Sequence, residues 1–353
     1  MPLTGSFFSR TFVFGFDART SRGRMREKQS WFIRVFDTQK PDVVGVGECG
    51  PLPGLSIDDV PHFESVLSDV IKRVEGSEIP QDPEAWVARI VPPRFPSITF
   101  GLETALLDLI HGGRRVLFDN DFVRGVPIPI NGLVWMNKVE SMLRQAHQLV
   151  ERGFTCIKIK VGGEDFDEEC RMLREFRKAH GESNITLRLD ANGAFSPNDA
   201  LAKLDRLAEF SVHSIEQPIK AGSREMAAIC RMSPIPIALD EELIGREDDK
   251  DAILDKVKPS FIVLKPTLHG GLLHCRDWIK KAEERGIGWW ITSALESSIG
   301  LNAISQFVAA FRPTMAQGLG TGSIYTHNFA SPLKVVDGSL LSDPEGTWGP
   351  VVS

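Results

Sequence analysis

The chain has 353 residues, of which 42% are hydrophobic and 25% charged, and this length favours two domains of unequal size over one ordinary core. The net charge of −6 gives no basic surface for a polyanion, so we expect no nucleic-acid partner. Five cysteines without a CxxC pair argue against a zinc site or a disulfide framework, and without a signal-peptide pattern or about 18 consecutive apolar residues we expect a cytoplasmic protein with no membrane partner.

The chain begins with a pattern that differs from the rest. Residues 12–14 and 31–36 are predicted to be antiparallel strands, and residues 61–75 and 101–110 have the apolar spacing of helices. These elements indicate a small α+β unit. The polar connector at 18–30 is predicted to be a loop. Its part from Thr20 to Ser30 is either a mobile lid that brings a cation to the substrate or a solvated loop. The cations in this part are Arg22, Arg24, Arg26 and Lys28.

From residue 129 onward, strands and helices alternate regularly. Strands are predicted at residues 128–135, 156–161, 186–190, 212–216, 237–240, 261–265, 288–293 and 314–318, which is enough to close a barrel. Helices with charged outer faces are predicted at residues 139–152, 165–180, 197–210 and 272–285. Only about seven helices are evident in this part, fewer than the eight of a full barrel, because the chain becomes irregular after Gln317.

Three acidic residues stand at the ends of three consecutive apolar runs. Asp190, Glu216 and Asp240 are separated by about 25 residues each, the length of one strand and one helix. Parallel strands place their carboxyl ends on one face, so these carboxylates meet at a spacing that suits one hard divalent cation. Helix capping is the alternative role of each acid. The adjacent Glu241 is expected to face the other way and to support the ligands, although the choice between it and Asp240 stays open.

Basic residues accompany the acids on the same strands. Lys158 and Lys160 share one face of a strand because side chains alternate with period two, and Lys265 ends the strand after Asp240. Lysines directed into a barrel indicate catalysis or binding, since apolar residues would fill the barrel at lower free energy; ion pairs on the outer face are the alternative. Arg188 and Asn192 are expected to hydrogen-bond a substrate carboxylate or the metal ligands, although Asn192 also suits a turn.

A second group of polar candidates lies near the carboxyl end of the barrel. The run that contains Ser293, Glu296 and Ser297 lies where a strand meets a helix, so it either receives a substrate carboxylate or caps the helix. The glycine-rich loop around Gly320 offers backbone amides to an anion or makes a tight turn, and we expect Gly320 at the rim of the site.

Several of these segments resemble one known family over nearly the whole chain. They are Lys158-Ile159-Lys160, Asp190-Ala191-Asn192-Gly193, Glu216-Gln217-Pro218, Asp240-Glu241 and Lys265-Pro266. Together they resemble the muconate-lactonizing branch of the enolase superfamily. The resemblance implies an α/β fold with a modified TIM-type (β/α)7β barrel, residues 116–324. It also implies an N-terminal α+β capping domain, residues 1–115, which the C-terminal tail 325–353 joins.

The resemblance also implies a cofactor and catalytic roles. Mg²⁺, with Mn²⁺ as a possible substitute, is implied on Asp190, Glu216 and Asp240, with Lys160 and Lys265 on opposite faces of a small-molecule carboxylate substrate. Within the branch, residues 47–54, 293–300 and 318–322 resemble the o-succinylbenzoate synthase family of menaquinone biosynthesis. That activity is a dehydration in which one lysine removes the proton α to a carboxylate and the ammonium of the other stabilises the anion.

Other functions remain open at this point. An N-acylamino acid racemase or a dipeptide epimerase would use the same central residues, although residues 317–320 lack the Asp-x-Asp pair expected for a dipeptide substrate. A scaffold protein would be expected to lose at least one of the five central residues, and a Schiff-base aldolase would leave the three carboxylates without a purpose. The sequence does not indicate an oligomeric state.

Overall fold

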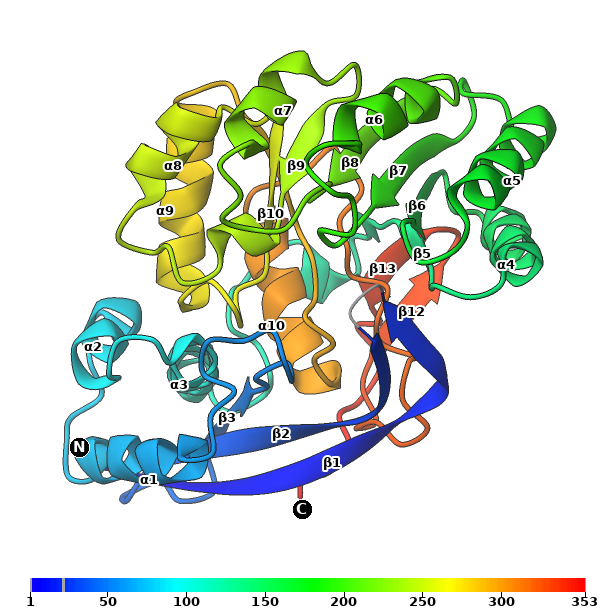
Figure 1. Ribbon diagram of the computed structural model, residues 1–353. Coiled ribbons are helices and arrows are strands. Elements are labelled where there is room, and N and C mark those ends of the chain that lie inside the picture. Colours follow the sequence, from blue (N-terminus) through cyan, green and yellow to red (C-terminus); the bar gives the residue numbers. More distant parts are fainter. Residues whose placement is uncertain (1, 21–22, 353) are drawn as a thin grey trace.

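The computed structural model describes residues 2–20 and 23–352. Its N-terminal unit is a three-stranded antiparallel sheet in the order β1-β2-β3, with three helices beside it (Figure 1). The strands are β1 (Leu3–Thr20), β2 (Gly23–Asp37) and β3 (Val44–Cys49), and the helices are α1 (Phe63–Val74), α2 (Pro83–Ile90) and α3 (Pro96–Ile110). The helices expected at residues 61–75 and 101–110 are present. Helix α2 was not predicted, although Asp82 caps its first turn.

β1 and β2 form one long hairpin, so the prediction of an irregular connector at residues 18–30 is wrong for its described part. Residues 18–20 pair with residues 23–25, because pairing satisfies the backbone polar groups even where the side chains are hydrophilic. Lys28 is buried and donates a hydrogen bond to Ser30 Oγ at 3.0 Å, so it does not belong to a solvated loop. Arg22, also expected in that loop, lies outside the described residues.

Helix α3 lies directly on β3 because glycine removes the intervening side chains. A Cβ atom on Gly45 would overlap the carbonyl of Ala105, and one on Gly47 would overlap the carbonyl of Gly101. The absence of both side chains therefore allows the backbones of strand and helix to touch. This close contact fixes the position of α3 between the N-terminal sheet and the second unit.

The second unit is a parallel barrel, which confirms the predicted fold class. Seven of its strands form a sheet in the order β11-β10-β9-β8-β7-β6-β5. They are β5 (Gly132–Val134), β6 (Cys156–Lys160), β7 (Thr186–Asp190), β8 (Val212–Glu216), β9 (Ile237–Leu239), β10 (Phe261–Leu264) and β11 (Gly288–Ile291). In the described chain, seven α-helices alternate with them: α4 (Val139–Glu151), α5 (Phe166–Ala179), α6 (Ala200–Ala208), α7 (Met226–Met232), α8 (Lys250–Val257), α9 (Gly271–Glu283) and α10 (Ser298–Ala309). Helix α6 begins at Ala200 and not at residue 197 as predicted.

The strand predicted at residues 314–318 is reduced to a short closing segment. Gln317 forms a parallel bridge with Ile130, and Gly318 forms one with Thr292. The N–H of Gly318 donates to the carbonyl of Ile291 at 2.8 Å. These bridges join β11 to the chain just before β5, so the sheet closes into a barrel.

The C-terminal tail divides between the two units. Tyr325 forms an isolated bridge with Phe14, and Phe329 packs edge-on against Phe12 of the hairpin. Further along, β12 (Leu333–Val336) and β13 (Ser339–Ser342) form a hairpin, and β13 pairs with β4 (Ile128–Pro129) before the barrel. Near the end of the tail, Trp348 and Val351 pack against the cluster that contains Phe12 and Phe32 of the hairpin. The boundary expected between residues 115 and 116 stays a prediction.

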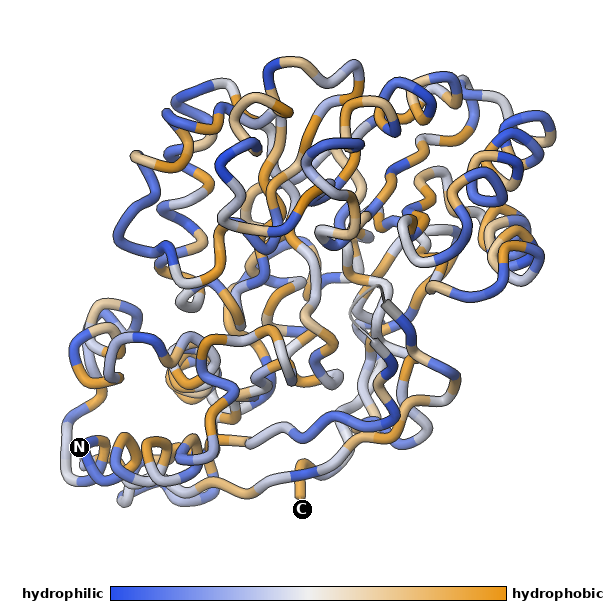
Figure 2. The backbone as a smooth tube through the Cα atoms, viewed as in Figure 1, coloured by the Kyte–Doolittle hydropathy of each residue, from blue (hydrophilic) through white to orange (hydrophobic). Residues whose placement is uncertain are grey.

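The core of the barrel lies between the strands and the surrounding helices. The strands are hydrophobic along most of their length, whereas the outer turns of helices such as α5 are hydrophilic (Figure 2). This is the pattern of parallel strands covered on their outer face by amphipathic helices. None of the helices within residues 2–20 and 23–352 combines the length and the hydropathy needed to cross a membrane.

Candidate active site

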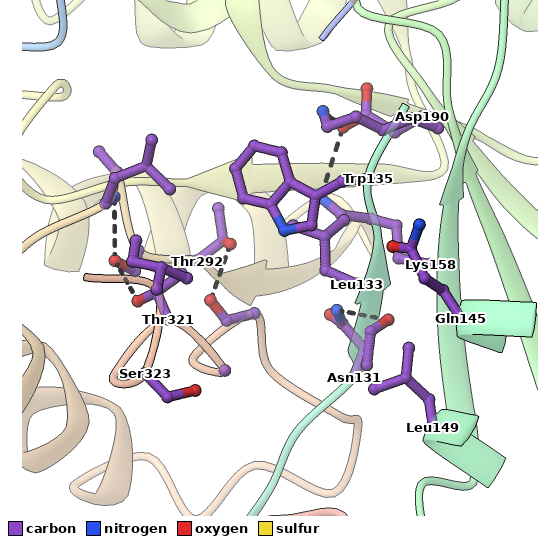
Figure 3. Close-up of a pocket in the computed structure, with 18 of the residues that line it drawn as sticks. Asn131, Leu133, Trp135, Gln145, Leu149, Lys158, Asp190, Thr292, Thr321 and Ser323 are labelled. Carbon is purple, nitrogen blue, oxygen red and sulfur yellow. Dashed lines mark hydrogen bonds and ion pairs between the residues drawn. The ribbon is translucent and has the colours of Figure 1, made fainter. Parts of the chain in front are cut away.

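A cavity of about 480 Å³ lies at the carboxyl ends of the barrel strands, and Figure 3 shows residues such as Lys158, Asp190 and Thr292 around it. Residues of both units line this cavity. The N-terminal unit contributes mainly apolar side chains, among them Phe16, Met25, Leu52 and Leu55. The rest of the chain contributes apolar residues such as Leu133, Leu149 and Leu295. It also contributes charged, polar and aromatic side chains, among them Asn131, Trp135, Lys158, Lys160, Asp190, Asn192, Asp240, Lys265, Thr292, Ser293 and Thr321, and the backbone of Gly320. A cavity with an apolar roof and convergent polar groups is the usual form of a small-molecule site.

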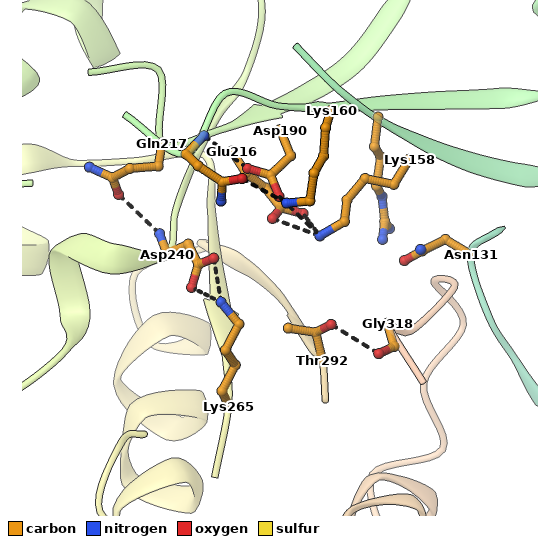
Figure 4. A network of polar contacts seen from close by, with 12 residues as sticks. Asn131, Lys158, Lys160, Asp190, Glu216, Gln217, Asp240, Lys265, Thr292 and Gly318 are labelled. Atoms are coloured by element: carbon orange, nitrogen blue, oxygen red, sulfur yellow. Dashed lines mark hydrogen bonds and ion pairs between the residues drawn. The ribbon is translucent and has the colours of Figure 1, made fainter. Parts of the chain in front are cut away.

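Lys160 and Lys265 face the cavity from opposite walls. Lys160 is the last residue of β6, and Lys265 directly follows β10. Counted around the closed barrel from β5, β6 is the second strand and β10 the sixth of eight, with Gln317 and Gly318 as the last. Strands four places apart in an eight-stranded barrel stand across from each other. Figure 4 shows the two lysines approaching the carboxylates from different sides.

The three acidic residues come from the strands between those walls. Asp190 ends β7 and pairs in register with Glu216 at the end of β8, and Asp240 directly follows β9. All three are buried, with 2%, 0% and 1% of their surface exposed, respectively. The sequence-based expectation that parallel strands bring these residues to one edge therefore describes their placement correctly.

Lys158 balances the charge of two of these carboxylates. Its Nζ lies 2.9 and 3.0 Å from the two oxygens of Glu216 and 3.5 Å from Asp190 Oδ2. Burial by itself lowers the pKa of Lys158, but the carboxylates outweigh it and the net pKa lies above the ordinary value. Burial raises the pKa of Glu216 to about 7, against the opposing charge of Lys158. For Asp190, the ammonium groups of Lys160 and Lys158 outweigh burial and hold its pKa below the usual range.

The donor set fits a hard divalent cation in its chemistry. Carboxylate oxygens are the ligands that Mg²⁺ prefers, and three buried carboxylates at one barrel edge supply negative charge that water cannot solvate. As the side chains stand, no group of three His, Cys, Asp or Glu residues in the described parts of the chain converges as a metal cage. Each carboxylate is instead turned toward a lysine ammonium, which supplies the compensating positive charge.

Lys160 is also held by Asn192, which follows β7. Asn192 Oδ1 accepts a hydrogen bond from Lys160 Nζ at 2.7 Å, and its Nδ2 donates to Glu241 Oε1 at 3.0 Å. Asn192 has a positive φ of 45°, so it makes the turn and contacts the site at once. Glu241 thus acts on the site through Asn192, and Asp240 is the residue that lines the cavity.

The segment around Lys265 is fixed by two residues that the sequence analysis missed. Lys265 Nζ contacts the Asp240 carboxylate, and the Lys265 backbone N–H donates to His269 Nδ1 at 2.8 Å. Burial lowers the pKa of His269 to about 3, so its ring is neutral and Nδ1 is free to accept. Gln217 Oε1 accepts from the N–H of Asp240 at 3.2 Å and so holds the turn after β9.

Arg188 does not reach the cavity, in contrast to the expectation that it binds a substrate carboxylate. It is buried, its guanidinium lies 4.1 Å from the ring centroid of Trp290, and its Nη1 donates to the Ala316 carbonyl at 2.8 Å. Arg188 shares a strand face with Asp190, but it lies two positions earlier and therefore deeper in the barrel. There, an aromatic face and a backbone oxygen hold the cation.

The helix start after β11 receives a carboxylate of the chain itself. Ser297 caps α10, since its Oγ accepts from the N–H of Ile299 at 3.2 Å. Helix capping was one of the two roles expected for this run. The anion at this N-terminus is Glu48 from β3, which accepts from the N–H of Ser297 at 3.0 Å. Substrate therefore cannot use these amides while Glu48 occupies them.

Ser293 lines the cavity, whereas Glu296 lies behind it. Ser293 Oγ donates to Glu296 and accepts from Thr321 Oγ1 at 2.8 Å, and Thr267 also donates to Glu296. Gly320 lines the cavity beside Asn131, in agreement with its expected place at the rim. The sequence did not indicate Asn131 and Trp135, which flank β5, or Phe16 of the hairpin, because only the packing of the two units brings them to this cavity.

Comparison with known proteins agrees with this architecture. Residues 141–346 match the family model described as enolase C-terminal domain-like. The chain therefore belongs to the enolase superfamily. It is 42% identical to the o-succinylbenzoate synthase of Desulfotalea psychrophila over 93% of this chain and 96% of that protein. At this similarity, the chain is a member of the o-succinylbenzoate synthase family.

Solved structures support the same fold. The crystal structure of MenC from Desulfotalea psychrophila superposes with a TM-score of 0.85 at 40% identity, covering 97% of this chain and all of that one. The L-Ala-D/L-Glu epimerase from Bacillus subtilis also superposes with a TM-score of 0.85, but at 20% identity over 99% of this chain and 98% of that one. The second likeness concerns the fold alone.

Proposed function

We propose that the chain is a Mg²⁺-dependent dehydratase that converts 2-succinyl-6-hydroxy-2,4-cyclohexadiene-1-carboxylate to o-succinylbenzoate, a step of menaquinone biosynthesis. The single observation that carries the proposal is the pair Lys160 and Lys265, on opposite walls of one cavity with three buried carboxylates between them. Similarity to the o-succinylbenzoate synthase of Desulfotalea psychrophila supports this choice of reaction. A substrate ring placed between the two lysines has one of them on each face.

Asp190, Glu216 and Asp240 would hold the metal. When bound, Mg²⁺ supplies positive charge to the substrate carboxylate, which makes the adjacent C–H bond more acidic. Mn²⁺ has the same preference for oxygen ligands and would substitute for it. The lysine contacts of these carboxylates would then be replaced in part, and Lys158 would remain beside Glu216 as a second positive charge.

The lysines have separate tasks in this reaction. The amine of Lys160 removes the proton α to the carboxylate, and the electron pair of that C–H bond moves to the carboxylate. The pair then returns to form the ring double bond as the neighbouring C–O bond breaks. Lys160 gives the same proton to the departing hydroxide, which leaves as water, and the ring becomes aromatic. The ammonium of Lys265 stabilises the anion from the other face.

The last barrel segment favours this reaction over epimerisation of a dipeptide. A carboxylate at this segment would pair with the ammonium group of a dipeptide, but residues 317–320 are Gln-Gly-Leu-Gly. The Gln317 side chain is committed to the backbone, because its Oε1 accepts from Ile291 N–H at 2.8 Å and its Nε2 donates to the Met315 carbonyl at 2.9 Å. The proposed substrate carries carboxylates on its ring and on its succinyl chain but no ammonium group, so it needs no acidic partner at this wall.

The proposal is tested by an ultraviolet assay for the aromatic product, with Mg²⁺ and with a chelator in its place. Wild type should convert the cyclohexadiene precursor only with the metal, and Lys160→Ala should lose at least about 100-fold in kcat because the base is gone. A panel of N-succinylamino acids and dipeptides, followed by solvent deuterium exchange, tests the racemase and the epimerase. Exchange in that panel without any aromatic product would refute the dehydratase assignment.

A further inference from the structure

Two buried glutamates of the N-terminal unit reach into the barrel. Glu48 of β3 has no exposed surface, and its carboxylate accepts hydrogen bonds from three groups in the first turn of α10. These are the N–H of Ser297 at 3.0 Å, the hydroxyl of Ser297 at 2.6 Å and the N–H of Gly300 at 3.0 Å. The carboxylate thus satisfies amides that a helix leaves unpaired at its start.

Glu103 of α3 makes the equivalent contact with the preceding helix. It is also fully buried, and it accepts from the N–H of Leu272 at 2.6 Å and from the N–H of Leu273 at 3.4 Å, in the first turn of α9. An acidic side chain is favourable at a helix N-terminus because the N–H groups and the helix dipole both present positive charge. Each of these two barrel helices is thus capped by an acid from the N-terminal unit.

Each helix carries a glycine where the carboxylate enters. A Cβ atom on Gly271 would lie 2.8 Å from the carboxyl carbon of Glu103, and one on Gly300 would lie 2.9 Å from Glu48 Oε2 and 2.7 Å from Cβ and Cγ of Glu296. Distances of this kind leave no room for a side chain without displacing the glutamate. The two helix starts are therefore complementary in shape, as well as in charge, to the two acids.

The loops before these helices carry residues of the candidate active site. The loop from β10 to α9 begins with Lys265, and the loop from β11 to α10 contains Ser293, which lines the cavity. The two loops are joined to each other, because Glu296 accepts from both Thr267 and Ser293. Any displacement of either helix start would therefore reach the cavity wall.

We propose that Glu48 and Glu103 are positioning residues, through which the N-terminal unit fixes the loops that carry Lys265 and Ser293. The role in catalysis rests on the proposed function; the physical link between the units does not. Neither glutamate lines the cavity, so neither touches substrate. Because reacting groups must be held closely, a small displacement of Lys265 lowers kcat more than it changes KM.

The test compares variants of these acids with a matched control. In Glu103→Ala and Glu48→Ala, kcat for the cyclohexadiene precursor should fall about 10- to 100-fold, while KM changes by less than about threefold. Glu103→Gln keeps an oxygen that can accept from Leu272 and should recover kcat to within about threefold of wild type. The control is Asp58→Ala, which removes a buried carboxylate that caps α3 within the N-terminal unit and should leave kcat unchanged.

Amide hydrogen exchange gives a readout that needs no substrate. The first turns of α9 and α10 should exchange faster in the alanine variants and not in Asp58→Ala. If the alanine variants do not fold, Glu103→Asp, which keeps the carboxylate but shortens the side chain that reaches the N–H of Leu272, should lower kcat and speed exchange in α9. Unchanged kcat with unchanged exchange, or an equal loss of kcat in Asp58→Ala, would overturn the proposal. If wild type does not turn over the precursor, the proposed function fails, whereas the exchange data still decide the link between the units.

Discussion

Lys158→Met tests whether the buried lysine compensates the carboxylates of the candidate active site. Methionine has a similar length and volume but no charge, so the substitution removes the ammonium without opening a large cavity. Asp190 keeps its 3.0 Å contact with Lys160 Nζ, so the uncompensated charge falls mainly on Glu216. Glu216 has no exposed surface and cannot be solvated by water.

The expected loss of stability follows from these contacts. Removal of one partner from a buried ion pair costs about 3–5 kcal/mol in the free energy of unfolding. With a urea m value of at least about 3 kcal/mol per molar, the unfolding midpoint should fall by about 1 M. The native pKa of Glu216, about 7 in wild type, should rise further without Lys158, since that cation lowers it. The native variant then binds a proton more tightly than its unfolded chain does, so its stability falls as the pH rises, and the deficit is larger at pH 8 than at pH 5.5.

The measurement is urea unfolding of wild type and Lys158→Met at both pH values, with and without Mg²⁺. A divalent ion would compensate the carboxylate charge that the loss of Lys158 leaves unpaired. Mg²⁺ should therefore raise the unfolding midpoint of the variant more than that of wild type. Equal midpoints of the two proteins at pH 8 would refute the reasoning about buried charge. An equal response to Mg²⁺ would contradict the assignment of Glu216 as a metal ligand.

Three further predictions concern other parts of the structure. Burial raises the pKa of Asp58 from 3.8 to about 6, so wild type should lose about 3 kcal/mol of stability as the pH rises from 4 to 7, and Asp58→Asn should lack this dependence in urea titrations. Gly318→Ala places a Cβ 2.5 Å from Thr292 Cβ at the barrel closure and should destabilise the fold by about 1–3 kcal/mol, measured by thermal unfolding. Asn192→Ala removes the contact to Lys160 and should lower kcat/KM about 10- to 100-fold, while the positive φ of 45° at this residue should cost the variant only about 1 kcal/mol of stability.

Each of these predictions has an outcome that contradicts it. Parallel pH profiles of wild type and Asp58→Asn would show that this carboxyl is not the source of the dependence. An unchanged melting temperature of Gly318→Ala would mean that the closing segment yields to the added methyl group. Wild-type kcat/KM in Asn192→Ala would show that Lys160 holds its position without the amide.

The class of fold and the central residues of the site could be predicted from the chain alone, because they depend on local patterns. An apolar run indicates a buried strand, and the alternation of side chains with period two places Lys158 and Lys160 on one face. Parallel strands joined by helices place all their carboxyl ends together, so Asp190, Glu216 and Asp240 were expected at one edge without knowledge of any contact.

The tertiary structure decided which groups meet across long separations in the chain. Glu48 and Ser297 are 249 residues apart, and no local pattern links them. Arg188 was expected to bind a substrate carboxylate or the metal ligands, but its contact with Trp290 depends on how deep in the barrel each side chain lies. Residues 18–20 and 23–30 of the polar segment lie in strands because neighbouring strand residues are there to pair with them. Local sequence determines direction and face, whereas packing of the closed barrel against the N-terminal unit determines the partner.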